Sequence, residues 1–204
     1  MVNMIEGLKK DYRKKKSEIV KRLNEFKNVW QVRDNKKLFE ELCFCLLTPQ
    51  SKAKICWNAV LRLKSNDFKN IGLCLEGVRF KNNKTKYIQS AMKSFENIKK
   101  NINQYNNIYE LREWLVKNVK GLGYKESSHF LRNIGKGENI AILDRHILKN
   151  LKKLGVIKKI PLCLTAKTYI EIENKMKTFS KKIGIPVSHL DLLFWSKETG
   201  EIFK

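Results

Sequence analysis

The chain has 204 residues, enough for one domain or two small ones, which excludes a large multidomain assembly. Its composition is 42% hydrophobic and 10% aromatic, so it can build a core, and this argues against intrinsic disorder. With 43 Lys and Arg against 20 Asp and Glu, the net charge is +23, which predicts a polyanionic partner, most commonly a nucleic acid. A ribosomal or membrane-surface protein is the alternative that composition leaves open.

The cysteines and the N-terminal segment predict an intracellular protein, located in the cytoplasm or nucleoid. The cysteine count is odd and includes no CxxC pair, and the opening MVNMIEGLKKDYRKKK has no apolar stretch after its charges. Cys43 and Cys45 lie in the apolar run LCFCLL and are predicted to be small core residues. No apolar run approaches the roughly 20 residues needed to span a bilayer, so we expect no membrane partner.

Hydrophobic periodicity predicts an all-α fold. Apolar residues between Leu38 and Leu47 recur at helical spacing, and Pro49 predicts the end of that helix. Ser188 is expected to cap the last helix and Gly200 to end it. The expected helices, in chain order, cover residues 5–27, 38–47, 51–63, 84–99, 108–118, 125–134, 145–154, 166–183 and 189–198.

One segment, VKGLGYKESSHFLRNIG over residues 119–135, differs from the other helical stretches. It predicts a helix, a tight hairpin at Gly121 and Gly123, and a second helix, because two glycines two apart permit a sharp turn and a close backbone approach. The helix that follows begins with unpaired N–H groups and a positive dipole end, which together suit a phosphate. An ordinary helix–helix turn is the alternative.

A lysine and an aspartate lie at the starts of two successive predicted helices. Asp144 follows three apolar residues in AILDRHIL, where the common role of an aspartate is that of N-cap. Lys125 lies 19 positions earlier. Two helices joined by a short loop can bring both N-termini into one cleft, where an amine and a carboxylate can act as nucleophile and base.

These motifs resemble those of the helix-hairpin-helix DNA glycosylase superfamily, with GLGYK at the hairpin and LDRHI at the aspartate. The segment TPQS, which contains Gln50, resembles the loop that fills the gap left by an extruded base. ELCFCLLT, GVRF at 77–80 with Lys84, and the ending DLLFW…ETG…K over 191–204 resemble the archaeal-type (type 2) 8-oxoguanine DNA glycosylase/AP lyases. The resemblance covers residues 38–204.

The resemblance implies a base excision repair enzyme that removes 8-oxoguanine through a lysine Schiff base and cleaves the strand by β-elimination. Lys125 would attack C1′ of a nucleotide flipped out of the duplex, because that carbon is inaccessible while the base is stacked. Asp144 would stabilise positive charge on the sugar and help manage the proton of the amine. A phosphate contact for Lys125 is the alternative, and His129 and His189 are expected to be structural.

The resemblance also implies the DNA-binding residues. Gly121 and Gly123 would shape the hairpin whose backbone amides hold a phosphate, and a monovalent cation bound there is left open. Gln50 would enter the stack opposite the vacated position, with an ordinary polar loop residue as the alternative. His146 would contact a phosphate.

Base recognition is assigned to three residues by the same resemblance. 8-Oxoguanine differs from guanine by a proton on N7 and an oxygen on C8, so a discriminating site needs an acceptor or a donor there. The terminal Lys204 offers both an ammonium and the α-carboxylate, and the apolar Ile202 and Phe203 could pin the tail. Phe80 and Trp195 would stack on the flipped base, although either could belong to the core.

The expected architecture is two helical subdomains around a basic cleft. Residues 32–134 would form a helical barrel that includes the helix-hairpin-helix at about 108–134. Residues 1–31 and 135–204 would form the second subdomain, with the lysine and the aspartate at the junction. We expect a monomer whose partner is double-stranded DNA with an oxidised base or an abasic site.

No metal or cofactor is expected. Related glycosylases hold an iron–sulfur cluster with four C-terminal cysteines, whereas here only Cys163 lies beyond Cys74. Three alternatives stay open: a glycosylase of this superfamily for another damaged or mispaired base, a non-catalytic helix-hairpin-helix DNA-binding protein, and a ribosomal or structural RNA-binding protein. The last two leave the pairing of the lysine with the aspartate unexplained.

Overall fold

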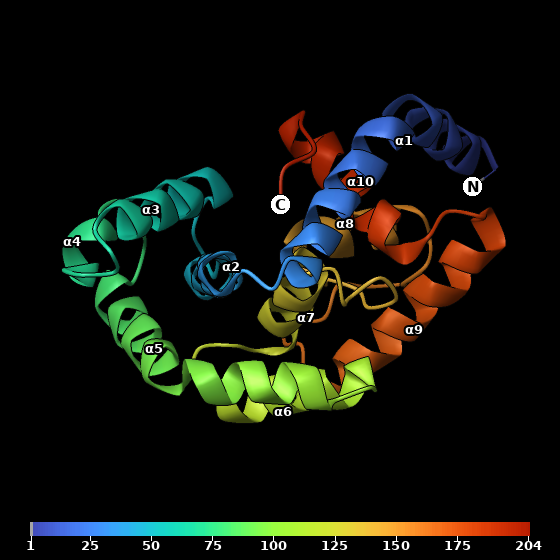
Figure 1. Ribbon diagram of the computed structural model, residues 1–204. Helices are drawn as coiled ribbons and strands as arrows, with labels where there is room; N and C mark the ends of the chain where they lie inside the picture. Colours follow the sequence, from blue (N-terminus) through green and yellow to red (C-terminus); the bar gives the residue numbers. More distant parts are fainter. Residues whose placement is uncertain (1) are drawn as a thin grey trace.

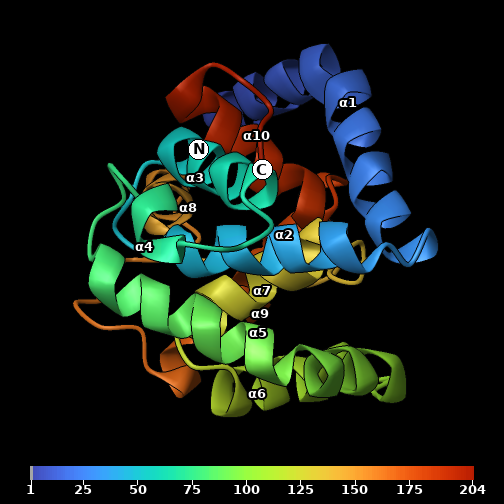
Figure 2. The same ribbon diagram turned by 60° about the vertical axis from the view of Figure 1, so that its left-hand side comes forward.

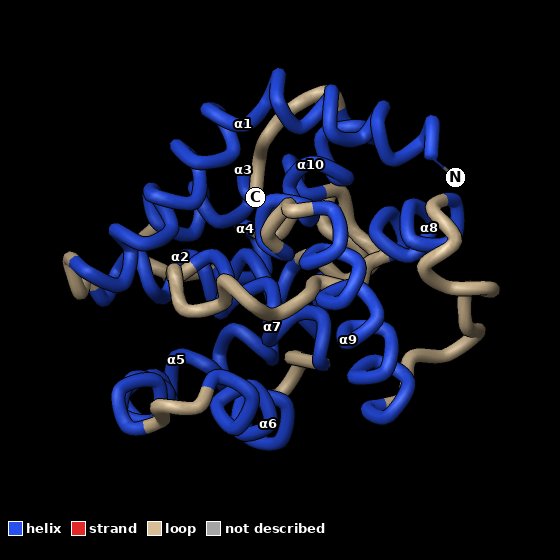
Figure 3. Tube along the Cα trace, turned by 90° about the vertical axis from the view of Figure 1, so that its right-hand side faces the viewer, coloured by secondary structure: helices blue, strands red, loops and turns tan. Residues whose placement is uncertain are grey.

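The computed structural model describes residues 2–204, which fold into ten α-helices and contain no strand (Figure 3). The all-α prediction is therefore confirmed. No helix within this part of the chain combines the length and the apolar character needed to cross a bilayer. The helices are α1 (Val2–Gln31), α2 (Asn35–Leu47), α3 (Ala53–Ser65), α4 (Ile71–Cys74), α5 (Lys81–Gln104), α6 (Ile108–Asn118), α7 (Tyr124–Asn133), α8 (Arg145–Lys153), α9 (Ala166–Ile183) and α10 (Val187–Thr199).

The sequence pattern located nine of these helices and missed α4. With four residues, α4 is too short for its hydrophobic period to be recognised. The prediction that Ser188 caps the last helix is wrong, because α10 begins at Val187 with Pro186 in the cap position. The fixed φ of proline suits a helix start, and the Pro186 carbonyl accepts from the N–H of Leu190 at 2.9 Å. Gly200 ends α10 at φ +84°, as predicted.

The helices are arranged around α2 and α7, which pack against each other near the centre of the molecule. Figure 1 shows α3, α4, α5 and α6 in an arc on one side of this pair, and α1, α8, α9 and α10 on the other side. Figure 2 brings the arc forward, with α2 and α7 behind it. The C-terminus reaches α2, where the Lys204 side chain contacts Glu41.

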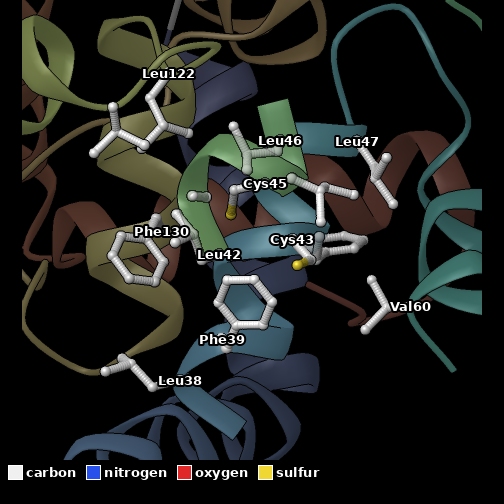
Figure 4. Close-up of a cluster of buried hydrophobic side chains, with 14 of the residues drawn as sticks. Leu38, Phe39, Leu42, Cys43, Cys45, Leu46, Leu47, Val60, Leu122 and Phe130 are labelled. Carbon is white, nitrogen blue, oxygen red and sulfur yellow. The ribbon is translucent and has the colours of Figure 1, made fainter. Parts of the chain in front are cut away.

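Two clusters of buried apolar side chains support this arrangement. The first draws on residues 38–140, and the second on α1 and residues 141–194. Figure 4 shows part of the first, in which Leu42 and Cys45 of α2 lie near Leu122 of the hairpin and Phe130 of α7. Cys43 and Cys45 are fully buried, as predicted. The division of the chain into subdomains 1–31 with 135–204 and 32–134 stays a prediction.

The backbone that enters α8 is fixed by a buried polar network. Glu173 on α9 pairs with the Arg112 guanidinium through both oxygens, at 2.7 and 2.9 Å, and also accepts from the N–H of Ala141 at 2.8 Å. The Tyr169 hydroxyl donates to the Ala141 carbonyl at 2.7 Å and accepts from the N–H of Leu143 at 3.1 Å. These bonds pair main-chain polar groups of a buried segment that has no regular secondary structure. They also fix the position at which α8 starts.

Candidate active site

A cleft of about 940 Å³ lies between the loop that joins α2 to α3, one face of α7, the start of α8 and the C-terminal end of the chain. Both hydrophobic clusters contribute elements to its walls. Six of the nine site residues predicted from the sequence line it. They are Gln50, Lys125, Asp144, His146, Trp195 and Lys204.

Charge in the cleft is mainly positive. Its cationic lining residues are Lys52, Lys54, Arg79, Lys125, Arg132, Arg145 and Lys204, and its carboxylates are Glu126, Asp144, Asp191 and Glu201. This excess agrees with the basic character of the whole chain and suits a polyanion.

Lys125, the second residue of α7, points its amine toward the end of α2. Its Nζ donates to Thr48 Oγ1 at 3.2 Å, while the Thr48 hydroxyl donates to the carbonyl of Cys45 at 3.0 Å. Its second neighbour is Glu126, whose Oε1 lies 3.6 Å from Nζ. The amine is thus held in the cleft by a neutral hydroxyl and one nearby carboxylate, and it keeps about a fifth of its side-chain surface exposed.

Asp144 is the N-cap of α8, as the sequence predicts. Its Oδ1 accepts from the N–H of Ile147 at 2.8 Å, and its Oδ2 accepts from the indole N–H of Trp195 at 3.1 Å. Both oxygens are therefore engaged, and the carboxylate is held in one orientation at the positive end of a helix. This arrangement suits a fixed negative charge facing the cleft.

The two aromatic residues predicted to stack on a base lie in different environments. Trp195 lines the cleft, and its N–H positions Asp144, a role that sequence reasoning missed. Phe80 does not line the cleft and is 53% exposed at the start of α5. The Arg79 guanidinium lies 5.5 Å from the Phe80 ring centroid, and Arg79 is the residue of this pair that reaches the cleft. Stacking by Phe80 stays a prediction.

The hairpin between α6 and α7 requires only one of its two glycines. Gly121 has φ +96°, and a Cβ there would lie 2.5 Å from the Tyr87 ring, so no other residue fits without rearrangement. Gly123 has φ −92°, which any residue adopts, and it caps α7 without a side-chain hydrogen bond. The first N–H groups of α7 therefore have no side-chain cap, as a phosphate site needs. Neither glycine lines the cleft itself.

Hydrogen bonds from Lys84 hold the loop that carries Gln50. The Lys84 ammonium is buried and donates to the carbonyls of Leu47 at 2.6 Å and Pro49 at 2.7 Å, and to Ser51 Oγ at 3.0 Å. Burial lowers the pKa of Lys84. These bonds hold the turn and leave Gln50 at φ +53°, a left-handed conformation that the surrounding contacts maintain.

Lys204 is buried at the floor of the cleft, with its ammonium turned into the protein. The ammonium pairs with Glu41 on α2, lies 3.6 Å from the Trp57 ring centroid and 5.5 Å from that of Phe44. Burial lowers the pKa of this amine, while Glu41 opposes the shift. The ammonium is thus committed to protein partners, which leaves the terminal carboxylate as the other polar group of this residue.

The tail before Lys204 is held by both hydrophobic clusters. Phe203 packs against the first cluster, with its ring centroid 6.3 Å from that of Phe44, and Ile202 packs against the second. The prediction that these apolar residues pin the tail is confirmed. Their contacts give the last residue a defined position.

His146 lies at the rim of the cleft, where its Nδ1 is 3.6 Å from Glu198 Oε2. Its side chain is 38% exposed. A DNA phosphate can reach the side chain at this location. The phosphate contact by His146 stays a prediction.

Sequence reasoning gave no site role to three buried ionisable residues that line the cleft. Arg132 and Asp191 form a buried ion pair at 3.3 Å, and burial raises the pKa of Asp191 to about 7. His129, expected to be structural, lines the cleft without a hydrogen-bond partner for either ring nitrogen. His129 and Arg132 follow Lys125 by four and seven positions, so helical spacing alone places all three on one face of α7.

The fold is that of a helix-hairpin-helix DNA glycosylase. The structure matches the crystal structure of the Methanocaldococcus jannaschii 8-oxoguanine glycosylase/lyase in complex with a 15mer DNA containing 8-oxoguanine, with a TM-score of 0.91, 34% identity and full coverage of both chains. It also matches the 8-oxoguanine DNA glycosylase of Thermotoga maritima, with a TM-score of 0.91, 29% identity and full coverage of both chains.

Sequence comparisons identify the family. The sequence model of the family described as 8-oxoguanine DNA glycosylase matches residues 19–185. The 8-oxoguanine DNA glycosylase/AP lyase of Fusobacterium nucleatum is 50% identical, over 97% of this chain and 96% of the relative. That of Methanocaldococcus jannaschii is 37% identical, over 100% of this chain and 99% of the relative. The chain belongs to the 8-oxoguanine DNA glycosylase family, which confirms the resemblance found in its sequence.

Proposed function

We propose that this protein is a bifunctional DNA glycosylase/AP lyase that removes 8-oxoguanine from double-stranded DNA and then cuts the strand. The observation that carries the proposal is that Lys125 and Asp144 line one basic cleft, each at the start of a helix. The fold matches that of the Methanocaldococcus jannaschii 8-oxoguanine glycosylase/lyase in complex with DNA containing 8-oxoguanine. A non-catalytic DNA-binding protein would not need an amine and a fixed carboxylate in the same cleft.

In the proposed reaction, the Lys125 amine attacks C1′ of the extruded nucleotide and the damaged base leaves. The amine and the opened sugar then form a Schiff base, which permits β-elimination of the 3′ phosphate. The Thr48 hydroxyl accepts a hydrogen bond from the amine and orients it. Asp144, held by Trp195 and by its own helix, stabilises the positive charge that develops on the sugar.

The same proposal assigns the DNA contacts. A phosphate would bind at the hairpin, where the first N–H groups of α7 have no side-chain cap, and a second phosphate near His146. Gln50 would enter the stack opposite the vacated position from the loop that Lys84 supports. The charge of +23 attracts DNA without reading its sequence.

We propose further that the two hydrophobic clusters correspond to two subdomains, 32–134 and 1–31 with 135–204. Such a protein would act inside the cell as a monomer and without an iron–sulfur cluster. The distribution of its cysteines supports the proposal that it needs no iron–sulfur cluster. Four of the five cysteines are buried in the helical core, and Cys163 alone is exposed. A monovalent cation at the hairpin is left open.

The test of the proposed function is single-turnover excision from a duplex with one 8-oxoguanine. We expect release of the base and a strand cut that leaves a β-elimination product, with the opposite base varied through all four. Matched duplexes with an oxidised pyrimidine or a mispair test the alternative substrates. Tight DNA binding without release of any of these bases would contradict the proposal and favour a non-catalytic DNA-binding protein.

The terminal carboxylate of Lys204 is the group that we propose to contact the base, because the ammonium is engaged by Glu41. Deletion of Lys204, or addition of one glycine after it, removes or displaces this carboxylate. Each change should slow 8-oxoguanine excision by about 10-fold or more, since a polar contact to the base is lost. Cleavage at a preformed abasic site, which has no base, should change little. Equal loss of both activities would contradict this role.

A further inference from the structure

His129 is a buried polar residue with no side-chain hydrogen-bond partner in residues 2–204. The residue is 6% exposed, and neither ring nitrogen forms a hydrogen bond of good geometry within residues 2–204. The main chain of Lys204 is the polar group that interacts with the ring. It nevertheless lines the cleft, one helical turn after Lys125 and on the same face of α7. Buried polar atoms in folded proteins are nearly always satisfied, so an exception that faces a cleft indicates a ligand.

The surroundings of His129 determine the protonation state of its imidazole. Burial lowers its pKa well below the usual value, and the cations of Arg132, Lys125 and Lys204 lower it further, while the main chain of Lys204 acts in the opposite direction. The imidazole is therefore neutral and offers one N–H donor and one acceptor nitrogen. Its ring also packs edge-on against Phe44, with the centroids 5.5 Å apart.

The other histidine that was expected to be structural behaves differently. His189 hydrogen-bonds to the Tyr12 hydroxyl at 2.9 Å and packs against that ring. It does not line the cleft. His189, which supports the fold, thus has a side-chain hydrogen-bond partner, whereas His129 has none in residues 2–204.

We propose that His129 hydrogen-bonds to the extruded base and contributes to the recognition of 8-oxoguanine, beside the terminal main chain of Lys204. This inference rests on the proposed function. 8-Oxoguanine carries an N–H donor at N7 and an acceptor oxygen at C8, side by side. The imidazole N–H donates to that oxygen while the terminal carboxylate accepts from N7–H. Guanine lacks both groups and leaves the donor and the carboxylate unpaired.

The test compares two activities of the same variants. His129→Phe keeps an aromatic ring against Phe44 but removes both nitrogens, and His129→Asn keeps a donor and an acceptor. We expect His129→Phe to slow single-turnover excision of 8-oxoguanine by about 10-fold or more, because the base loses a hydrogen bond. Cleavage at a preformed abasic site should stay within about twofold of the wild type, because that substrate has no base for His129 to contact. His129→Asn should recover part of the loss.

His189→Phe is the matched control. It should leave the ratio of 8-oxoguanine excision to abasic-site cleavage unchanged. An equal loss of excision and abasic-site cleavage in both His129 variants would overturn the inference, because it indicates a structural role. Unchanged excision by His129→Phe would overturn it as well. If the wild-type protein releases no 8-oxoguanine, the proposed function itself fails, and the control measurement on the wild type reveals this before any variant is compared.

Discussion

Replacement of Lys125 by Gln should abolish the borohydride-trapped complex between the protein and DNA containing 8-oxoguanine. A carboxamide cannot attack C1′ or form a Schiff base, so both base release and strand cleavage should fall by about 1000-fold or more. The fold should persist, because within residues 2–204 the Lys125 side chain makes one hydrogen bond, to Thr48, and glutamine can replace it. Trapping and single-turnover cleavage, measured on the same duplex, check this expectation.

Lys52→Gln is the matched control for Lys125→Gln. Lys52 is a cation of the same cleft that stands at the cap position of α3, where its side chain makes no cap hydrogen bond. Both substitutions remove one positive charge and should weaken DNA binding similarly, with a slightly smaller salt dependence. Only Lys125→Gln should lose trapping. A Lys125→Gln protein that still forms the complex would show that another amine is the nucleophile.

Asp144→Asn should separate the structural role of Asp144 from its proposed electrostatic role. Asparagine is as good an N-cap as aspartate, so α8 should keep its cap. The thermal stability should fall only by the loss of the hydrogen bond from Trp195, because the amide nitrogen of asparagine cannot accept it. The negative charge opposite the developing positive charge on the sugar is lost, however. We expect excision to slow by about 100-fold, the effect typical of removing one preorganised electrostatic group.

Asp144→Ala completes this comparison because it removes the cap as well as the charge. It should show the same loss of excision as Asp144→Asn and, in addition, a loss of stability of about 1 kcal/mol. Thermal unfolding and single-turnover excision of both variants give the two readouts. If Asp144→Asn excises 8-oxoguanine at the wild-type rate, Asp144 is only an N-cap.

The sequence determined the features of this protein that depend on neighbours along the chain. Helical periodicity, the stop at Gly200 and the cap at Asp144 are local, because each is decided within one or two turns of helix. The motifs around Lys125 and Asp144 also identified the family, and the structure places both residues in one cleft.

Only the tertiary structure decided what the individual side chains of the cleft contact. The Lys204 ammonium faces inward because Glu41, 163 positions away, is there to pair with it. Trp195 positions Asp144, and Phe80 stays outside the cleft. His129 has the spacing of a cleft residue, but its lack of a side-chain partner within residues 2–204 depends on every element packed around it. Such contacts join residues that are distant in sequence, and no local pattern encodes them.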